Sequence, residues 1–326
     1  MGVVVVTDHV FPDLEQEGGI LAAAGHELRY EGDAATVDDV RRLTARADAV
    51  LNCYAPVPAD VIGAMRNCRV IARYGIGLDT IDIDAATEHG VLVSNVPDYC
   101  IDEVSDHALA LLLALGRGIA RLNGSVRAGE WNPMAARPLH RLGGRTLGLV
   151  GFGRIARRLA EKAAPIGMRI VATDPYVPAD VIEAAGVGAV DLPTLLSVSD
   201  VVSIHAPMSE ENRHLIGAAE LAGMREGAFL VNTSRGPLVD LDALRDALRE
   251  GRLGGAALDV LETEPPNPGD PLLHRGDVIV TPHAAFYSEE AMVEQQRKAA
   301  EQVVLALRGE TPPYAVNARA LASRAR

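Results

Sequence analysis

The chain has 326 residues, of which 48% are hydrophobic and 23% are charged, and its formal net charge is −13 at pH 7. Its length exceeds the size at which a single hydrophobic core usually stops growing, so we expect two domains. The negative charge argues against a nucleic-acid partner and against an acidic membrane surface, because both require a basic field.

The three cysteines, Cys53, Cys68 and Cys100, are odd in number and lack the spacing of metal ligands. This pattern argues against a disulfide framework, gives no metal site and fits a reducing compartment. No segment approaches the roughly 20 apolar residues that a membrane-spanning helix needs. We therefore expect a cytoplasmic protein with no membrane partner.

Short β-branched runs alternate with helical patterns along the first hundred residues. The predicted strands are VVVVTD, HELRYEG, AVLN and RVIARYG, and the helices between them cover 12–24, 36–46 and 58–65. This βα alternation predicts a mostly parallel sheet covered by helices.

A strongly apolar helix is predicted over Asp102 to Leu115, because Ala108 to Leu115 are eight consecutive apolar residues. A helix that is apolar all round is buried, either in one core, between two domains or between two subunits. A long polar loop carrying Trp131 is predicted next, over 123–145. Loops of this length are often functional or interfacial.

A second βα series begins at RTLGLVGFG and continues through MRIVATD, DVVSIHAP, GAFLVNTS, GAALDVL and DVIVTPH. A final helix should begin at Ser288, a good N-cap followed by two glutamates, and end at Gly309. The apolar face of this helix should pack against a sheet.

The segment GLVGFGRIA carries the pattern G-x-G-x-x-A between a strand and a helix. Gly151 permits a tight turn, Gly153 lets the backbone approach a pyrophosphate, and the small Ala156 allows close packing of helix and strand. The next strand ends at Asp174, 23 residues after Gly151, where an acid can bind the ribose hydroxyls and repel a 2′-phosphate. The pattern predicts a dinucleotide site that favours NAD over NADP.

Four polar residues follow later predicted strands: Arg235, Asp259, Glu264 and His283. Ligands of open α/β sheets bind at the carboxyl ends of strands. Each residue alone also fits a structural role, as a surface charge or a histidine satisfied within the fold.

Together with RYGIGLDTIDIDAA, these segments resemble the D-isomer-specific 2-hydroxyacid dehydrogenase family over essentially the whole chain. Within that family, YGIGLDTIDI, GAFLVNTSRGPLVD, GRLGGAALDVLETEP and TPHAAFYSEEA are most similar to the C-terminal-binding-protein branch.

The resemblance implies an α/β protein with two Rossmann or flavodoxin-like doubly wound parallel-sheet domains. An NAD domain over 102–282 would be inserted into a discontinuous substrate domain made of 1–101 and 283–326. A dimerisation helix and loop over 103–145 would form a homodimer, although the same helix could belong only to the monomer core.

For reduction of a 2-oxo acid, the planar fork of Arg235 suits the carboxylate and the carbonyl oxygen, a geometry that lysine cannot reproduce. His283 would be the acid in reduction and the base in oxidation. Glu264 would hydrogen-bond the other ring nitrogen, fix its orientation and favour the imidazolium.

The resemblance also implies residues that line the substrate and cofactor sites. The substrate-binding residues would be Tyr54, Ile76, Gly77 and Phe286, with Tyr99 and Trp131 as further pocket candidates. The cofactor-binding residues would be Gly151, Phe152, Gly153, Arg154, Ile155, Asp174, Pro175, Tyr176, His205, Ala206, Pro207, Thr233, Ser234 and Asp259. His205 could equally be structural.

No lysine or arginine lies between Asn52 and Pro58, which disfavours a phosphorylated substrate, with Arg73 as a possible exception. We expect glyoxylate, hydroxypyruvate or a similar small 2-oxo acid. Two alternatives are an NAD(H)-sensing binding protein similar to the co-repressor relatives, and a specialised biosynthetic dehydrogenase for an unusual acid such as a phosphonate. A third possibility keeps the fold but oxidises formate or phosphite. Family members that oxidise formate have glutamine in place of Glu264, which disfavours formate, whereas phosphite is less firmly excluded.

Overall fold

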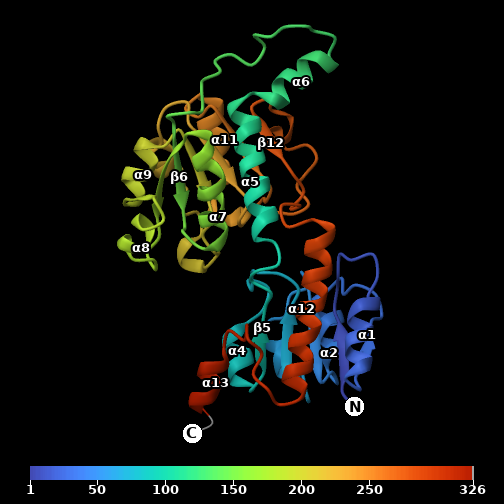
Figure 1. The fold of residues 1–326 in the computed structure, drawn as a ribbon. Helices are drawn as coiled ribbons and strands as arrows, with labels where there is room; N and C mark the ends of the chain where they lie inside the picture. The colour runs from blue at the N-terminus through green and yellow to red at the C-terminus, as the bar shows by residue number, and fades with distance from the viewer. Residues whose placement is uncertain (325–326) are drawn as a thin grey trace. The chain divides into compact units, whose positions relative to one another are not determined.

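A computed structural model describes residues 1–324 of the chain (Figure 1). The chain divides into two compact units, one made of residues 1–100 with the chain from Tyr287 onward, and the other made of Ile101–Phe286. Each unit is built on one sheet in which all strand pairs are parallel. The predicted fold class of two parallel-sheet α/β units is therefore confirmed.

The first unit contains a five-stranded sheet with the order β2-β1-β3-β4-β5. This is the flavodoxin-like arrangement, in which the order reverses between β1 and β3 and ligands bind beyond the carboxyl ends of the strands. Its strands are β1 (Val3–Val6), β2 (Glu27–Arg29), β3 (Ala49–Asn52), β4 (Val70–Arg73) and β5 (Leu92–Ser94). Its helices are α1 (Glu15–Ala23), α2 (Val37–Thr44), α3 (Ala59–Ala64), α4 (Ile83–Glu88), α12 (Glu289–Leu307) and α13 (Ala318–Arg324).

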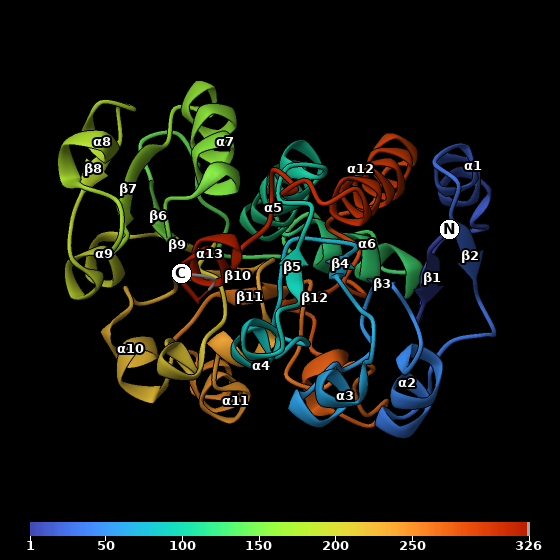
Figure 2. The same ribbon diagram turned by 90° about the horizontal axis from the view of Figure 1, so that it is seen from below.

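The helix α12 returns from the end of the chain to cover the first sheet. Ser288 is its N-cap, and the Ser288 hydroxyl accepts a hydrogen bond from the Ala291 N–H at 3.0 Å. Its buried face, which includes Met292, Ala299 and Val303, packs against α1, β3 and β4. Figure 2 shows α1 and α12 on one face of this sheet and α2, α3 and α4 on the other. The predicted start of this helix and its need for a sheet are both confirmed.

The second unit contains a seven-stranded sheet with the order β12-β11-β10-β9-β6-β7-β8. Apart from one added strand this is the Rossmann order, and it reverses between β6 and β9. Its strands are β6 (Thr146–Val150), β7 (Arg169–Thr173), β8 (Gly188–Ala189), β9 (Val201–Ile204), β10 (Phe229–Asn232), β11 (Gly255–Leu258) and β12 (Val278–Val280). Its α-helices are α5 (Ile101–Gly116), α6 (Ile119–Arg127), α7 (Arg154–Ala163), α8 (Ala179–Glu183), α9 (Leu192–Val198), α10 (Ala218–Gly223) and α11 (Leu241–Arg249).

The apolar helix α5 is buried along one face only. It packs against α7 and the sheet through residues such as Leu111, Leu112 and Leu115, whereas Ala110 is exposed. The unit therefore covers one face of the helix, and what covers the other face stays a prediction.

The segment predicted as a polar loop over 123–145 is partly helical, because α6 extends to Arg127. Gly118, at φ +60°, turns the chain between α5 and α6, and a side chain there would lie 2.6 Å from the Ala136 Cβ. Good helix formers such as Leu122 continue the helix beyond this turn. Within residues 1–324 no single helix is long and apolar enough to cross a membrane, and α5 with α6 reach that length only across a 63° bend.

Candidate active site

The glycine loop between β6 and α7 has the geometry that a diphosphate needs. Gly151 has φ +93°, and a Cβ there would lie 2.8 Å from the backbone of His205 and Ala206. Gly153 is the N-cap of α7, makes no side-chain cap and has open space where a Cβ would be. The first N–H groups of the helix therefore face a site that an anion can approach. Ala156 is fully buried, as its packing role predicts.

The carboxylate of Asp174 follows β7 and borders this loop. Its Oδ2 accepts a hydrogen bond from the Phe152 N–H at 2.8 Å, and its Oδ1 accepts one from the Tyr176 N–H at 2.8 Å. Asp174 therefore fixes the backbone of the glycine loop as well as presenting an acid beside it. Pro175 and Tyr176 are exposed next to it.

The predicted cofactor residues after β9 and β10 are linked by hydrogen bonds. Ser234 donates its hydroxyl to the carbonyl of Ala206, which joins the two loops. The His205 side chain lies 2.9 Å from the Ser203 hydroxyl, and burial lowers the pKa of its imidazole to about 4. His205 is therefore neutral at physiological pH and has a structural partner.

Arg235 follows β10 on a loop that lies under the segment leading to Glu264. A Cβ at Gly236 would lie 2.0 Å from the carbonyl atoms of Leu261, so only glycine permits this crossing. The Leu261 N–H donates to Glu264 Oε1 at 2.9 Å, and the Arg235 charge acts on the same carboxylate. The two motifs NTSRG and LETEP are thus brought together.

His283 and Glu264 form a hydrogen-bonded pair. The Nδ1 atom of His283 lies 2.8 Å from Glu264 Oε2, and the two side chains are 25% and 37% exposed. Burial opposes ionisation of Glu264 most strongly, but the hydrogen bond and charge of His283, with smaller contributions from Leu261 and Arg235, hold the pKa of this carboxyl below its usual value. The pair is therefore an imidazole held against a carboxylate.

Asp259 anchors the turn that carries His283, a role that the sequence analysis did not find. Its side chain is buried, and it accepts hydrogen bonds from the Thr281 hydroxyl at 2.6 Å and from the Ala284 and Ala285 N–H groups at 2.9 Å. His107 of α5 lies 2.9 Å from the same Thr281 hydroxyl. His283 itself adopts a left-handed backbone conformation, φ 53°, and nothing in the linear sequence marks Thr281 or His107 as supports of this turn.

The predicted substrate residues divide between the two units. Phe286 belongs to the second unit, and its ring meets that of His283 edge to face at 6.3 Å between centroids. Tyr54, Ile76 and Gly77 belong to the first unit, on the loops that follow β3 and β4. Tyr54 is 41% exposed, whereas Ile76 and Gly77 are half-buried.

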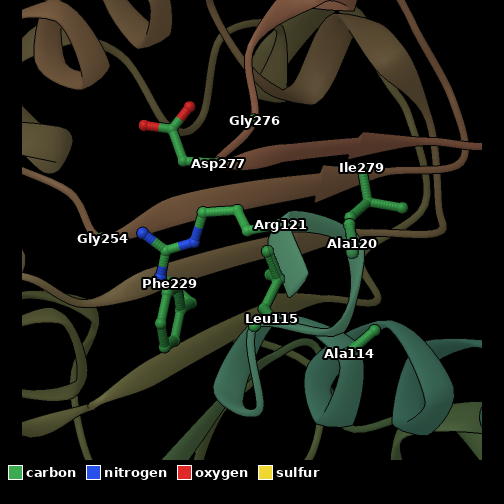
Figure 3. Close-up of a pocket in the computed structure, with 10 residues that line it drawn as sticks. Ala114, Leu115, Ala120, Arg121, Phe229, Gly254, Gly276, Asp277 and Ile279 are labelled. Carbon is green, nitrogen blue, oxygen red and sulfur yellow. The ribbon is translucent and has the colours of Figure 1, made fainter. Parts of the chain in front are cut away.

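A surface pocket lies near the amino ends of strands in the second sheet (Figure 3). Phe229, Gly254 and Asp277 line it where β10, β11 and β12 begin, and Arg121 lines it from α6. The dinucleotide loop and His283 follow the carboxyl ends of strands, so this pocket is not part of their site. Within residues 1–324 no cluster of three or more His, Cys, Asp or Glu side chains could hold a metal ion.

A dinucleotide loop and a cluster of polar residues both follow the carboxyl ends of strands in one doubly wound sheet. Together they define the class of the protein, which is a dinucleotide-dependent dehydrogenase. Residues 109–285 match the family described as D-isomer specific 2-hydroxyacid dehydrogenase, NAD binding domain.

Similar proteins are named as reductases or dehydrogenases of 2-oxo or 2-hydroxy acids. A glyoxylate reductase of Korarchaeum cryptofilum is 43% identical over 80% of this chain and 80% of its own length. A D-3-phosphoglycerate dehydrogenase of Methanocaldococcus jannaschii is 38% identical over 96% of this chain but only 59% of its own length. The structure of Aquifex aeolicus D-lactate dehydrogenase with NAD and lactic acid matches with a TM-score of 0.85 and 26% identity, over 94% of this chain and 96% of that one.

The chain belongs to the D-isomer specific 2-hydroxyacid dehydrogenase family. It is an NAD-dependent oxidoreductase that acts on the CH–OH group of 2-hydroxy acids, and the open N-terminus of α7 fits that cofactor.

Proposed function

We propose that the chain reduces a small, unphosphorylated 2-oxo acid, with Arg235, His283 and Glu264 as its catalytic residues. Bound NADH supplies the hydride that reaches C2. Arg235 holds the carboxylate and polarises the carbonyl with its planar fork. The observation that carries this proposal is the His283–Glu264 hydrogen bond at 2.8 Å beside the Arg235 loop.

The proton in this reaction is assigned to the Nε2 atom of His283. Its Nδ1 atom is engaged by Glu264, so the ring presents its other nitrogen to the substrate oxygen. The carboxylate is ionised, because its pKa is below the usual value, and it stabilises the imidazolium that donates the proton. In the direction of oxidation the same nitrogen accepts the proton from the hydroxyl group.

The domain roles follow from these assignments. The second unit, which includes the match to the NAD-binding domain, would hold the cofactor. The first unit would bind the substrate through Tyr54, Ile76 and Gly77. In the second unit the cofactor would contact Gly151 to Ile155, the segment Asp174–Tyr176, and the loops after β9 and β10. Asp259 would act there mainly by supporting His283.

An unphosphorylated substrate is supported by the charges of the first unit. No basic residue lies between Asn52 and Pro58, and Arg73 is only 4% exposed with two of its nitrogen atoms hydrogen-bonded to backbone carbonyls. A phosphoryl group needs such donors for itself. The relative named glyoxylate reductase fits this choice better than the relative named D-3-phosphoglycerate dehydrogenase.

The test is NADH oxidation against glyoxylate, hydroxypyruvate, branched 2-oxo acids, phosphohydroxypyruvate and a phosphonate analogue. We expect turnover with the small unphosphorylated acids, a loss of about 10² to 10⁴-fold in kcat for His283→Ala, and a severe loss for Arg235→Lys. Arg225→Lys is the matched control, because Arg225 is an exposed arginine of the same unit. Turnover restricted to a phosphorylated acid would overturn the substrate assignment.

A homodimer through α5, α6 and the following loop is supported by apolar side chains that are exposed in this segment. Trp131 is 90% exposed, Met134 58%, Ile119 55% and Val126 50%. Large apolar side chains exposed within one short segment favour an interface there. Trp131 is the only tryptophan, so its fluorescence should shift to longer wavelength on dilution as light scattering reports dissociation. A monomer at all concentrations would contradict the dimer.

Membership of the C-terminal-binding-protein branch rests on the four segments quoted above and is proposed on that basis. In an NAD(H) sensor, NADH would control capture of a protein partner while turnover stayed negligible. Measurable turnover that is lost in His283→Ala would exclude a pure sensor. The cytoplasmic location stays a prediction.

A further inference from the structure

Arg73, the last residue of β4, is a buried cation that no catalytic assignment uses. Only 4% of its surface is exposed. Its Nε donates to the carbonyl of Cys53 at 2.9 Å, and its Nη1 donates to the carbonyl of Gly77. One guanidinium therefore joins the loop after β3 to the loop after β4.

Asp8 also holds the first of these loops. Asp8 is the second residue after β1. Its side chain accepts hydrogen bonds from the N–H groups of Cys53 at 3.0 Å, Tyr54 at 2.5 Å and Ala55 at 3.0 Å. The carboxylate therefore fixes the N–H groups of the loop, while the guanidinium of Arg73 fixes the carbonyl of Cys53. Both side chains are at least nine-tenths buried.

The two loops lie where a sheet of this order binds its ligand. β1 and β3 are neighbours at the reversal of strand order, and β4 pairs with β3. Ligand sites of open α/β sheets form beyond the carboxyl ends of strands at this point. Tyr54 is on the first loop, and Ile76 and Gly77 are on the second.

A stabilising role alone does not account for a buried arginine here. Removing a guanidinium from water is costly, and an apolar side chain of similar volume often stabilises a fold equally well. What arginine adds is direction, because its planar fork donates in two fixed directions at once. The Arg73 guanidinium also lies 5.8 Å from the centre of the Tyr54 ring, within the range of a cation–π contact.

We propose that Arg73 and Asp8 are positioning residues that set the Tyr54 loop against the Ile76–Gly77 loop and thereby determine which 2-oxo acid side chains are accepted. This inference rests on the proposed function, because it takes these loops as the substrate site. In this proposal Arg73 acts through the loops, since its Nε and Nη1 atoms donate to the carbonyls of Cys53 and Gly77.

The test compares Arg73→Met, which keeps the apolar stem and removes the fork, with Arg69→Met. Arg69 is the matched control because it precedes β4 at its other end, is exposed and donates to a backbone carbonyl, that of Leu307. Hydrogen exchange is measured on both ligand-free proteins. In Arg73→Met the amides of 53–55, 57 and 75–79 should exchange about tenfold faster while β4 stays protected, and in Arg69→Met neither loop should change.

Steady-state kinetics supply the second measurement. For Arg73→Met we expect KM for the 2-oxo acid to rise about tenfold, the ratio of kcat/KM between glyoxylate and a branched 2-oxo acid to change at least about fivefold, and the Kd of NADH to stay within about twofold. Asp8→Asn should shift the same ratio and loosen the first loop. It also provides the test if Arg73→Met does not fold.

Two results would overturn the inference. A raised KM with unchanged exchange in both loops would make Arg73 a direct substrate ligand. Faster loop exchange with an unchanged substrate ratio would leave it a structural residue only. Absence of turnover in the unmodified protein would instead refute the proposed function, while the exchange measurement would still report whether Arg73 holds the loops.

Discussion

The backbone of His283 is tied to Asp259 at both ends of one short turn. The His283 N–H donates to the Asp259 carbonyl at 2.8 Å, and the Asp259 carboxylate accepts the N–H groups of the next two residues at 2.9 Å. This arrangement holds His283 at φ 53°, a conformation that residues with a Cβ rarely adopt. The support of His283, the proposed catalytic histidine, is thus a buried carboxylate that directly follows the neighbouring strand β11.

Asp259→Asn should therefore impair catalysis by misplacing His283. An amide cannot accept all of these hydrogen bonds, and an unpaired buried donor costs about 1–3 kcal/mol, which is roughly 5- to 150-fold if expressed in kcat. We expect kcat to fall within this range while the Kd of NADH changes little. The control is Asp277→Asn, since Asp277 lies at the opposite edge of the same sheet and pairs with Arg275. An equal loss in both variants would contradict the anchoring role.

Glu264→Gln should change the pH profile of reduction. The pKa of the Glu264 carboxyl is held below its usual value, so the carboxylate is ionised at neutral pH and its charge stabilises a proton on the imidazole hydrogen-bonded to it. Glutamine removes that charge, and the upper limit of the profile of kcat/KM against pH should move to lower pH. Rates are to be measured from pH 5 to 9, with the exposed Glu250→Gln as control. An unmoved limit would argue against the pair.

Asp174→Ala should relax the preference for NADH. If Asp174 borders the ribose as proposed, it would disfavour the 2′-phosphate of NADPH, since like charges in contact cost several kcal/mol. The ratio of kcat/KM for NADPH over NADH should therefore rise roughly 100-fold in the variant. The affinity for NADH should also fall, because Asp174 holds the N–H groups of Phe152 and Tyr176. Asp180→Ala, an exposed acid on α8, should leave the ratio unchanged. Equal use of both cofactors by the unmodified protein would already refute the assignment.

His205 should make the stability of the protein depend on pH. Burial lowers the pKa of its imidazole to about 4 from 6.5, so the unfolded chain binds a proton in this interval that the folded chain does not. The contribution to stability is complete above pH 6.5 and is lost as the pH falls toward 4. Thermal unfolding should show Tm falling more steeply below pH 6.5 in the unmodified protein than in His205→Gln. Parallel curves would show that His205 carries no such linkage.

The sequence predicted the parts of this fold that depend on local pattern. The alternation of strands and helices, the start of α12 at Ser288 and the turn at Gly151 follow from β-branched runs, a hydroxyl N-cap and a position that tolerates only glycine. It missed the end of α6, and it left open whether α5 is covered by its own unit or by another subunit. Local pattern cannot decide this, because how much of a helix is covered depends on what packs against it.

The sequence also identified the candidate site residues that follow the strands, namely Arg235, Glu264 and His283. It could do so because few side chains can bind a carboxylate or carry a proton at neutral pH. The sequence alone therefore determined the family, the NAD loop and the kind of chemistry. Only the tertiary structure revealed what holds these groups, namely Asp259 under His283 and Arg73 with Asp8 between the two loops of the first unit. Those contacts join segments that follow separate strands. Which segments become neighbours depends on the order of the strands in the sheet, and no single stretch of sequence encodes that order.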